Sequence, residues 1–149
     1  MKRAIIAVML AAFAAPAGAQ SASETVNSEL KQFASRYVET FNRGDMAGIA
    51  GLYQLPGVST ADLQAKLAKQ LADLRADEFG KMTLYGSYVC AHGAGNAQLQ
   101  MAFAYNYTYG GVMPPGDQST VFEMRKTDAG WRIVNSKDMP KDTGIVCSL

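Results

Sequence analysis

Few residues in this sequence have types and spacing that could do chemistry. The single histidine, His92, lies in a glycine-rich turn, where a histidine is more often solvated than catalytic. No group of His, Cys, Asp and Glu has the spacing of a metal site, so no metal and no cofactor is expected. Residues 93–95 lack the lysine and the strand-to-helix setting of a phosphate-binding loop, and a hairpin turn explains their glycines. Nucleophile-elbow and Cys–His patterns are absent as well.

Residues 1–19 have the pattern of a secretory signal peptide. A basic start is followed by an apolar run from Ala4 to Ala15, a helix-breaking Pro16 and the small residues Ala17-Gly18-Ala19. The run is too short to span a bilayer, although an uncleaved membrane anchor is the alternative. We therefore expect cleavage near Ala19-Gln20, a periplasmic or secreted location, and no membrane anchor after cleavage.

The two cysteines, Cys90 and Cys147, indicate stability rather than catalysis. An exported chain with an even number of cysteines usually oxidises them. Closing a loop of about 57 residues would stabilise the fold by roughly 4 kcal/mol on the chain-entropy model. We predict a Cys90–Cys147 disulfide that holds the C-terminal tail beside a sheet. The alternative is two unpaired thiols, one of them buried in the sheet.

The charge balance argues against nucleic acid as a partner. Losing Lys2 and Arg3 with the signal peptide lowers Lys plus Arg from 14 to 12, against 13 Asp plus Glu. The mature chain is close to neutral, and it has no basic run with interleaved aromatic residues. Residues 20–149 suit one domain with one core and a short C-terminal tail.

The stretch from residue 24 to residue 53 predicts an amphipathic helix that stops at a glycine and restarts as a shorter helix. Its apolar residues recur at steps of three and four, which places them on one face: Val26, Leu30, Phe33, Tyr37 and Phe41. Gly44 is placed to end the first helix in a left-handed cap. Asp45 is placed to begin the second helix by accepting free N–H groups.

A third helix is predicted from Ser59 or Thr60, with leucines every three or four residues up to a stop at Gly80. From Met82 the period changes to two. One face of this strand is expected to hold Met82, Leu84, Tyr88 and Cys90, and the other to hold Thr83, Tyr85, Ser87 and Val89.

Three more strands follow the first. A turn at residues 92–96 leads into a strand with alternating apolar residues, and further strands are predicted around Thr120 to Lys126 and after Gly130. Short turns between strands predict an antiparallel meander. The expected architecture is α+β, with three N-terminal helices packed on a curved four-stranded antiparallel sheet.

The first two helices resemble a known family. Arg36-Tyr37-Val38, Phe41-Asn42, Gly44-Asp45, Gly48 and Leu52-Tyr53 are similar to the opening of the NTF2-like superfamily, and residues 130–134 (Gly-Trp-Arg-Ile-Val) are similar to its last strand. The resemblance covers roughly residues 24–139. It implies the cone-shaped, cystatin-like fold shared by nuclear transport factor 2, ketosteroid isomerases and SnoaL-like polyketide cyclases.

The resemblance also suggests where catalytic groups would stand. Tyr37 matches the tyrosine that donates to a developing oxyanion in ketosteroid isomerases. The carboxylate base of those enzymes falls at Ala61, one place before Asp62, and their protonated sheet carboxyl falls near Thr120 or Val121. Because neither position holds an acid, isomerase chemistry is not supported. Tyr37 also fits as a core aromatic residue whose hydroxyl has a local partner.

SnoaL-like cyclases usually rely on an Asp–His pair or a histidine in the sheet. The position that often holds a histidine in the last strand is Asn135 here. By alternation, Asn135 and Lys137 share a face with Trp131 and Ile133, and they would place polar groups at the mouth of the cone. The alternative is that they form the solvated end of a strand.

The leading interpretation is an exported NTF2-like domain that binds a small hydrophobic molecule in an aromatic-lined cone. The candidate lining residues lie on the apolar faces of facing elements: Phe33, Tyr37, Phe41, Met101, Phe103, Tyr105, Met124 and Trp131. The same residues would also form a plain core.

Two alternatives stay open. The first is a homodimerisation or protein-association module that uses a polar outer sheet face formed by Thr83, Tyr85, Ser87, Gln98, Gln100 and Asn106. The second is a SnoaL-like cyclase or isomerase that uses Tyr37 with Asp62 or Asn135.

Overall fold

The apolar stripe of the first predicted helix packs against a sheet in the computed structural model, which describes residues 17–72, 81–106, 116–140 and 144–145. Three helices come first: α1 (Ala17–Asn42), α2 (Met46–Gly51) and α3 (Thr60–Ala72). Four strands follow: β1 (Lys81–Ala91), β2 (Asn96–Asn106), β3 (Gly116–Thr127) and β4 (Gly130–Met139). The predicted α+β arrangement is confirmed.

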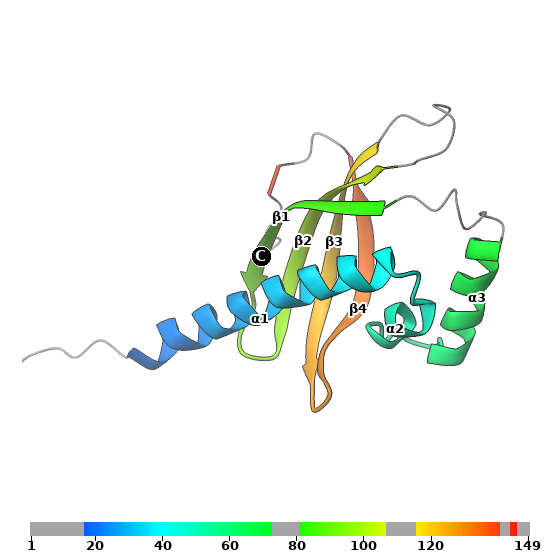
Figure 1. Ribbon diagram of the computed structural model, residues 1–149. Helices are drawn as coiled ribbons and strands as arrows, with labels where there is room; N and C mark the ends of the chain where they lie inside the picture. The colour runs from blue at the N-terminus through cyan, green and yellow to red at the C-terminus, as the bar shows by residue number, and fades with distance from the viewer. Residues whose placement is uncertain (1–16, 73–80, 107–115, 141–143, 146–149) are drawn as a thin grey trace, which may run out of the picture.

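The strands form one antiparallel sheet in the order β1-β2-β3-β4, which is the predicted meander. Figure 1 shows α1 crossing one face of this curved sheet and α2 beside β4, whereas α3 packs against α2 farther from the sheet. The buried side chains of α1 and of the inner sheet face belong to one hydrophobic cluster, in which Leu30, Leu99, Met101 and Ile133 are completely buried. The core therefore lies between α1 and the sheet.

The helix α1 begins at Ala17, shortly before the predicted cleavage point. Residues 1–16 lie outside the described residues, so the signal peptide and its cleavage stay predictions. Among the residues that the structure describes, no helix combines the length and the apolar character that crossing a membrane requires.

The junction between α1 and α2 turns as its sequence predicts. Gly44 has a φ of 68°, the left-handed conformation in which glycine ends a helix. The Asp45 carboxylate caps α2 by accepting the N–H of Gly48 at 2.8 Å. A Cβ at Gly48 would meet that carboxylate and would lie 2.8 Å from Thr40 Cγ2. The two glycines therefore have different roles, since Gly44 supplies a backbone conformation and Gly48 supplies space.

The cap of α3 is Ser59. Its Oγ accepts the N–H of Asp62 at 3.0 Å and donates to the Asp62 carboxylate at 2.6 Å, which resembles a capping box. The described part of α3 extends to Ala72, and the predicted stop at Gly80 lies outside the described residues.

Both edges of the sheet are partly closed by chain segments from the helical half. At β1, the Asn42 side chain donates to the Met82 carbonyl at 2.9 Å and accepts the Met82 N–H at 2.7 Å. At β4, the Ile133 N–H donates to the Leu52 carbonyl at 2.9 Å, and the Gln54 N–H donates to the Ile133 carbonyl at 2.8 Å. The connection after α2 thus contributes a single parallel bridge to the sheet.

A β-bulge overturns the predicted alternation of β1. The pairing with β2 shifts between Leu84 and Gly86, and an extra residue moves all later side chains to the opposite face. Ser87, predicted on the outer face, therefore stands opposite a buried methionine of β2. Tyr88 and Cys90, predicted on the apolar face, pair with outer-face glutamines. Val89, also predicted on the outer face, pairs with the buried Leu99. The predicted faces of these four residues are wrong.

A second bulge has the same effect in β4. The pairing with β3 shifts after Glu123, with Val134 as the extra residue of β4. Asn135 then pairs with Glu123 on the outer face, and Asp138 takes an inner position. The prediction that Asn135 and Lys137 share a face with the tryptophan and isoleucine at the start of this strand is therefore wrong.

Part of the C-terminal tail lies over the outer face of the sheet. The Gln100 amide donates to Ser119 Oγ at 2.9 Å and to the Gly144 carbonyl at 3.2 Å. Gln100, Ser119 and Val121 are buried, although they lie on the face turned away from α1. In Figure 1 the short red segment at residues 144–145 lies toward the β1 side of the sheet. The surface considered for association is thus partly occupied by the chain itself.

Candidate functional site

Tyr37 places a phenol inside the core. Its ring contacts the Phe122 ring at a centroid separation of 5.6 Å, and the residue is only 9% exposed. Its hydroxyl lies 3.1 Å from the Tyr53 hydroxyl, in a hydrogen bond that either group can donate. Tyr53 is held in reach because its segment bridges to Ile133 of β4. Two distant parts of the helical half therefore bring two phenols together.

Asp138 adds a carboxylate to the same region. The bulge in β4 places it on the inner face opposite Thr120, whose Oγ1 donates to the carboxylate at 2.8 Å. Thr120 is buried and lies two residues from Phe122, which contacts Tyr37, whereas Asp138 is exposed. We call Tyr37, Tyr53, Thr120 and Asp138 the phenol–carboxylate cluster.

The surroundings keep the Tyr37 phenol protonated. Burial raises its pKa well above the ordinary value of 10.0, and the charge and hydrogen bond of Tyr53 and the charge of Asp138 raise it further. Each of these effects disfavours the phenolate. At neutral pH Tyr37 therefore serves as a hydrogen-bond donor or acceptor and not as a base.

The cluster places hydrogen-bonding groups in apolar surroundings. A hydrogen bond from a phenol is stronger in apolar surroundings than in water. When Tyr53 donates to Tyr37, the Tyr37 O–H is left to donate to a bound molecule. The Asp138 carboxylate can accept a hydrogen bond or a proton. This arrangement supplies a polar end to an otherwise apolar interior.

Most of the predicted lining residues belong to the same buried cluster as Tyr37. One buried cluster contains Phe33, Tyr37, Met101, Phe103, Met124 and Trp131, and Phe41 packs against it half-buried. The side chain of Tyr105 lies outside the described part of the chain. The Trp131 indole N–H donates to the Glu29 carboxylate at 2.7 Å, so its polar edge is satisfied on the α1 side.

The other two candidate catalytic residues do not belong to the phenol–carboxylate cluster. Asp62 is exposed at the start of α3, where it binds Ser59. Asn135 lies on the outer face, and its side-chain oxygen accepts the N–H of Ser136 at 2.9 Å. It borders two outer recesses, with volumes of about 610 and 230 Å³. The carboxylate whose charge acts on the Tyr37 phenol is that of Asp138.

The remaining candidates of the sequence are a histidine and two cysteines. His92 is exposed in the turn between β1 and β2, where its backbone N–H donates to the Asn96 carbonyl at 2.9 Å. Cys90 is half-buried on β1, and Cys147 lies outside the described residues, so their pairing stays a prediction. Within the described ranges, no three His, Cys, Asp or Glu side chains gather as metal ligands would.

Sequence reasoning missed two members of the cluster. Tyr53 belongs to the family-like Leu52-Tyr53 pair, but its spacing from Tyr37 carries no signal of contact. Asp138 was hidden because strict alternation from Ile133 places it on the outer face, and only the bulge turns it inward.

No family model and no curated protein matches the chain. Solved structures do match it. An NTF2-like protein with a cystatin-like fold from Novosphingobium aromaticivorans is 16% identical at a TM-score of 0.67, over 89% of this chain and 94% of that chain. An NTF2-like protein of unknown function from Shewanella oneidensis is 13% identical at a TM-score of 0.60, over 75% of this chain and 97% of that chain.

A ketosteroid isomerase-like protein from Erwinia carotovora is 19% identical at a TM-score of 0.53, over 73% of this chain and 91% of that chain. Sequence identities of this size support a shared fold and do not support a shared activity. Together with the helices and the four-stranded meander, they confirm the predicted fold. The chain has the NTF2-like, cystatin-like fold.

Proposed function

We propose that this protein binds a small, largely hydrophobic molecule that presents an oxygen atom to Tyr37. The observation that carries the proposal is the buried Tyr37 hydroxyl, 3.1 Å from the Tyr53 hydroxyl and surrounded by apolar side chains. The bond to Tyr53 uses only part of the hydrogen-bonding capacity of this hydroxyl, which has one donor and two acceptor positions. Binding an oxygen atom gives the phenol pair a role.

The exposure of the cluster supports access to this site. Tyr37 is 9% exposed, Tyr53 is half-buried and Asp138 is exposed, so the polar groups run from the core to the surface. The apolar side chains of β2 and β3 beside them would contact the hydrophobic part of the molecule.

A phenol-to-phenyl substitution tests this proposal. Tyr37→Phe removes the hydroxyl and keeps the ring, so we expect the fold to persist. Protein isolated under native conditions should release a small molecule on denaturing extraction, and Tyr37→Phe should release at least about fivefold less, because one buried hydrogen bond is lost. Tyr85→Phe is the matched control, since Tyr85 is 66% exposed on β1. Equal yields from wild type and Tyr37→Phe would contradict the proposal.

We also propose that the protein is exported and carries the Cys90–Cys147 disulfide. Cys90 pairs with Gln98 on the outer face, and the Gly144 carbonyl is held by Gln100 on the same face. Cys147 follows Gly144 by three residues, which reach about 10 Å when extended. Alkylation of the unfolded protein without reductant should label no thiol, whereas labelling of two thiols would contradict the disulfide.

A second candidate function is acid–base catalysis in the same site. Asp138 favours it, because it is a carboxylate near the Tyr37 phenol, and one structurally similar protein is described as ketosteroid isomerase-like. We would follow the isomerisation of a β,γ-unsaturated cyclic ketone by the ultraviolet absorbance of its conjugated product. The rate should exceed that of buffer and fall at least about tenfold in Asp138→Asn. A rate equal to that of buffer would remove this candidate.

A further inference from the structure

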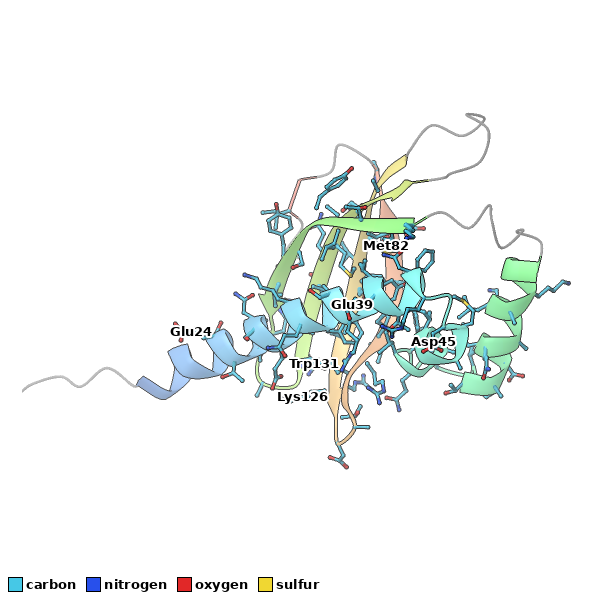
Figure 2. All side chains as sticks on the ribbon, viewed as in Figure 1. Glu24, Glu39, Asp45, Met82, Lys126 and Trp131 are labelled. Carbon is cyan, nitrogen blue, oxygen red and sulfur yellow. The ribbon has the colours of Figure 1, made fainter. Side chains whose placement is uncertain are left out.

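A recess of about 210 Å³ lies between α1 and the β3–β4 hairpin. Its α1 side is formed by Glu29, Gln32, Phe33 and Arg36, and its hairpin side by Lys126, Gly130 and Trp131. We call it the α1–hairpin recess. Figure 2 shows Lys126 and Trp131 beneath α1 on the side of the hairpin.

The Glu29 carboxylate in the recess already has hydrogen-bond partners. Glu29 accepts hydrogen bonds from Lys126 Nζ at 2.8 Å to each oxygen and from the Trp131 indole N–H at 2.7 Å. These bonds lower the pKa of Glu29, so the carboxylate is ionised at neutral pH. The Glu29 and Lys126 charges therefore cancel, and this pair joins α1 to the hairpin.

Arg36 leaves the recess with one uncompensated positive charge. Its guanidinium lies over the Phe33 ring, 5.5 Å from the centroid. In the described ranges, no carboxylate lies within ion-pair distance of Arg36, and Glu29 is paired with Lys126. A guanidinium stacked on a ring keeps its in-plane N–H groups, which match the two oxygens of a carboxylate. The recess thus holds two cations against one anion.

The floor of the recess is apolar. Phe33 and Trp131 are 1% and 4% exposed, and the Arg36 guanidinium and the Lys126 ammonium lie over their rings. The volume is below the range of about 300–1,000 Å³ typical of pockets for drug-sized molecules. A single ring or a short hydrocarbon body is the size that fits.

We propose that the α1–hairpin recess binds a small monocarboxylate, with its charged group on Arg36 and Gln32 and its apolar body on the Phe33–Trp131 floor. A single net charge suits a monoanion, whereas a phosphate dianion would be repelled by the Glu29 carboxylate. The site is separate from the phenol–carboxylate cluster, and the proposal does not depend on what that cluster binds.

The recess carries its own reporter, because Trp131 is the single tryptophan of the chain. We would titrate the full protein with benzoate while recording Trp131 fluorescence, and repeat the titration with benzamide, which has nearly the same shape without the charge. We expect a saturable change with benzoate, with a dissociation constant on the order of 1 mM, and binding of benzamide at least about tenfold weaker.

Variants locate the binding. Arg36→Gln should weaken benzoate binding at least about tenfold, whereas Arg43→Gln should leave it unchanged. Arg43 is an exposed arginine directly after the end of α1, and its side chain donates to Thr40. Tyr37→Phe should also leave it unchanged, which separates this recess from the cone. Thermal melts check that the variants are folded.

Four results would overturn the proposal. They are a linear response without saturation, equal binding of benzamide, unchanged binding in Arg36→Gln, and loss of binding in Tyr37→Phe. Tighter binding of inorganic phosphate than of benzoate would overturn the choice of a monocarboxylate.

Discussion

Tyr37 and Glu29 lie on the same helix, and their surroundings move their pKa values in opposite directions. Burial raises the pKa of the Tyr37 phenol. Hydrogen bonds from Lys126 and Trp131 lower the pKa of the Glu29 carboxylate. The difference follows from position on the helix, since Tyr37 points into the core and Glu29 meets two donors from the hairpin. Both groups are consequently fixed in one protonation state at neutral pH.

The Glu29 bonds predict a pH-dependent contribution to stability. Because the folded pKa lies below the unfolded value near 4.5, the stabilisation is complete above that value and is lost as the pH falls through the folded pKa. We expect Glu29→Gln to lower the melting temperature at pH 7, and the difference from wild type to shrink below about pH 4.5. Glu39→Gln, on an exposed position of α1, is the control. A difference that stays constant across this pH range would contradict the assignment.

Replacing Gly48 by alanine should destabilise the protein, although alanine has a higher helix propensity than glycine. An added Cβ would meet the Asp45 carboxylate and Thr40, so we expect Gly48→Ala to cost about 1–3 kcal/mol in the free energy of unfolding. Gly51→Ala is the matched control, because nothing lies within 4 Å of its Cβ position in the same helix. It should be neutral or stabilising by up to about 1 kcal/mol. Urea denaturation measures both, and equal effects would show that the space at Gly48 is not limiting.

The end of α1 and the start of β1 are joined by one side chain. Asn42 forms two hydrogen bonds with the Met82 backbone, much as a neighbouring strand would. This explains why the Phe41-Asn42 segment of the family-like opening ends in an amide, since only an amide offers a donor and an acceptor at this length.

Removing this amide should loosen the β1 edge. We expect Asn42→Ala to cost about 1–3 kcal/mol, because the buried Met82 N–H and carbonyl lose their partners. The Met82 amide should exchange its hydrogen faster than in wild type, as measured by NMR. Asn27→Ala, an exposed asparagine of α1, should change neither quantity. Unchanged exchange at Met82 would refute this role of Asn42.

The helices and the meander could be predicted because their signals are local. The spacing from Val26 to Phe41, the Gly44 turn and the change of period at Met82 each act over a few residues. The bulge at Val134 could not be predicted, since its residue type does not mark an extra residue. Gly86 beside Tyr85 is a signal of the first bulge, but a glycine also occurs in a regular strand. Each bulge turns every later side chain of its strand to the opposite face. The predicted faces of Cys90 and Asn135 are therefore wrong, and the inner position of Asp138 is not predicted.

The C-terminal part of the chain contacts the outer face of the sheet. The tail reaches Gln100 through Gly144, on the face where Cys90 stands. If the proposed Cys90–Cys147 disulfide forms, it fastens this tail across the sheet. We expect reduction to lower the free energy of unfolding by roughly 4 kcal/mol. The Cys90→Ser, Cys147→Ser double variant should be as stable as the reduced wild type, and a double variant as stable as the oxidised protein would contradict the tail's role.

The fold brings its chemistry together from three separate parts of the chain. Tyr37 comes from α1, Tyr53 from the segment after α2, and Thr120 and Asp138 from β3 and β4. No short stretch of sequence contains this cluster, which is why the residue types alone suggested no reaction. We propose that this cluster contacts a bound molecule.

Native mass spectrometry of the protein purified from the cells that make it tests this claim most directly. We predict a reproducible additional mass, one small molecule per chain, that disappears on denaturation and is diminished in Tyr37→Phe but not in Tyr85→Phe. A spectrum that shows only the mass of the polypeptide would contradict the proposed binding function.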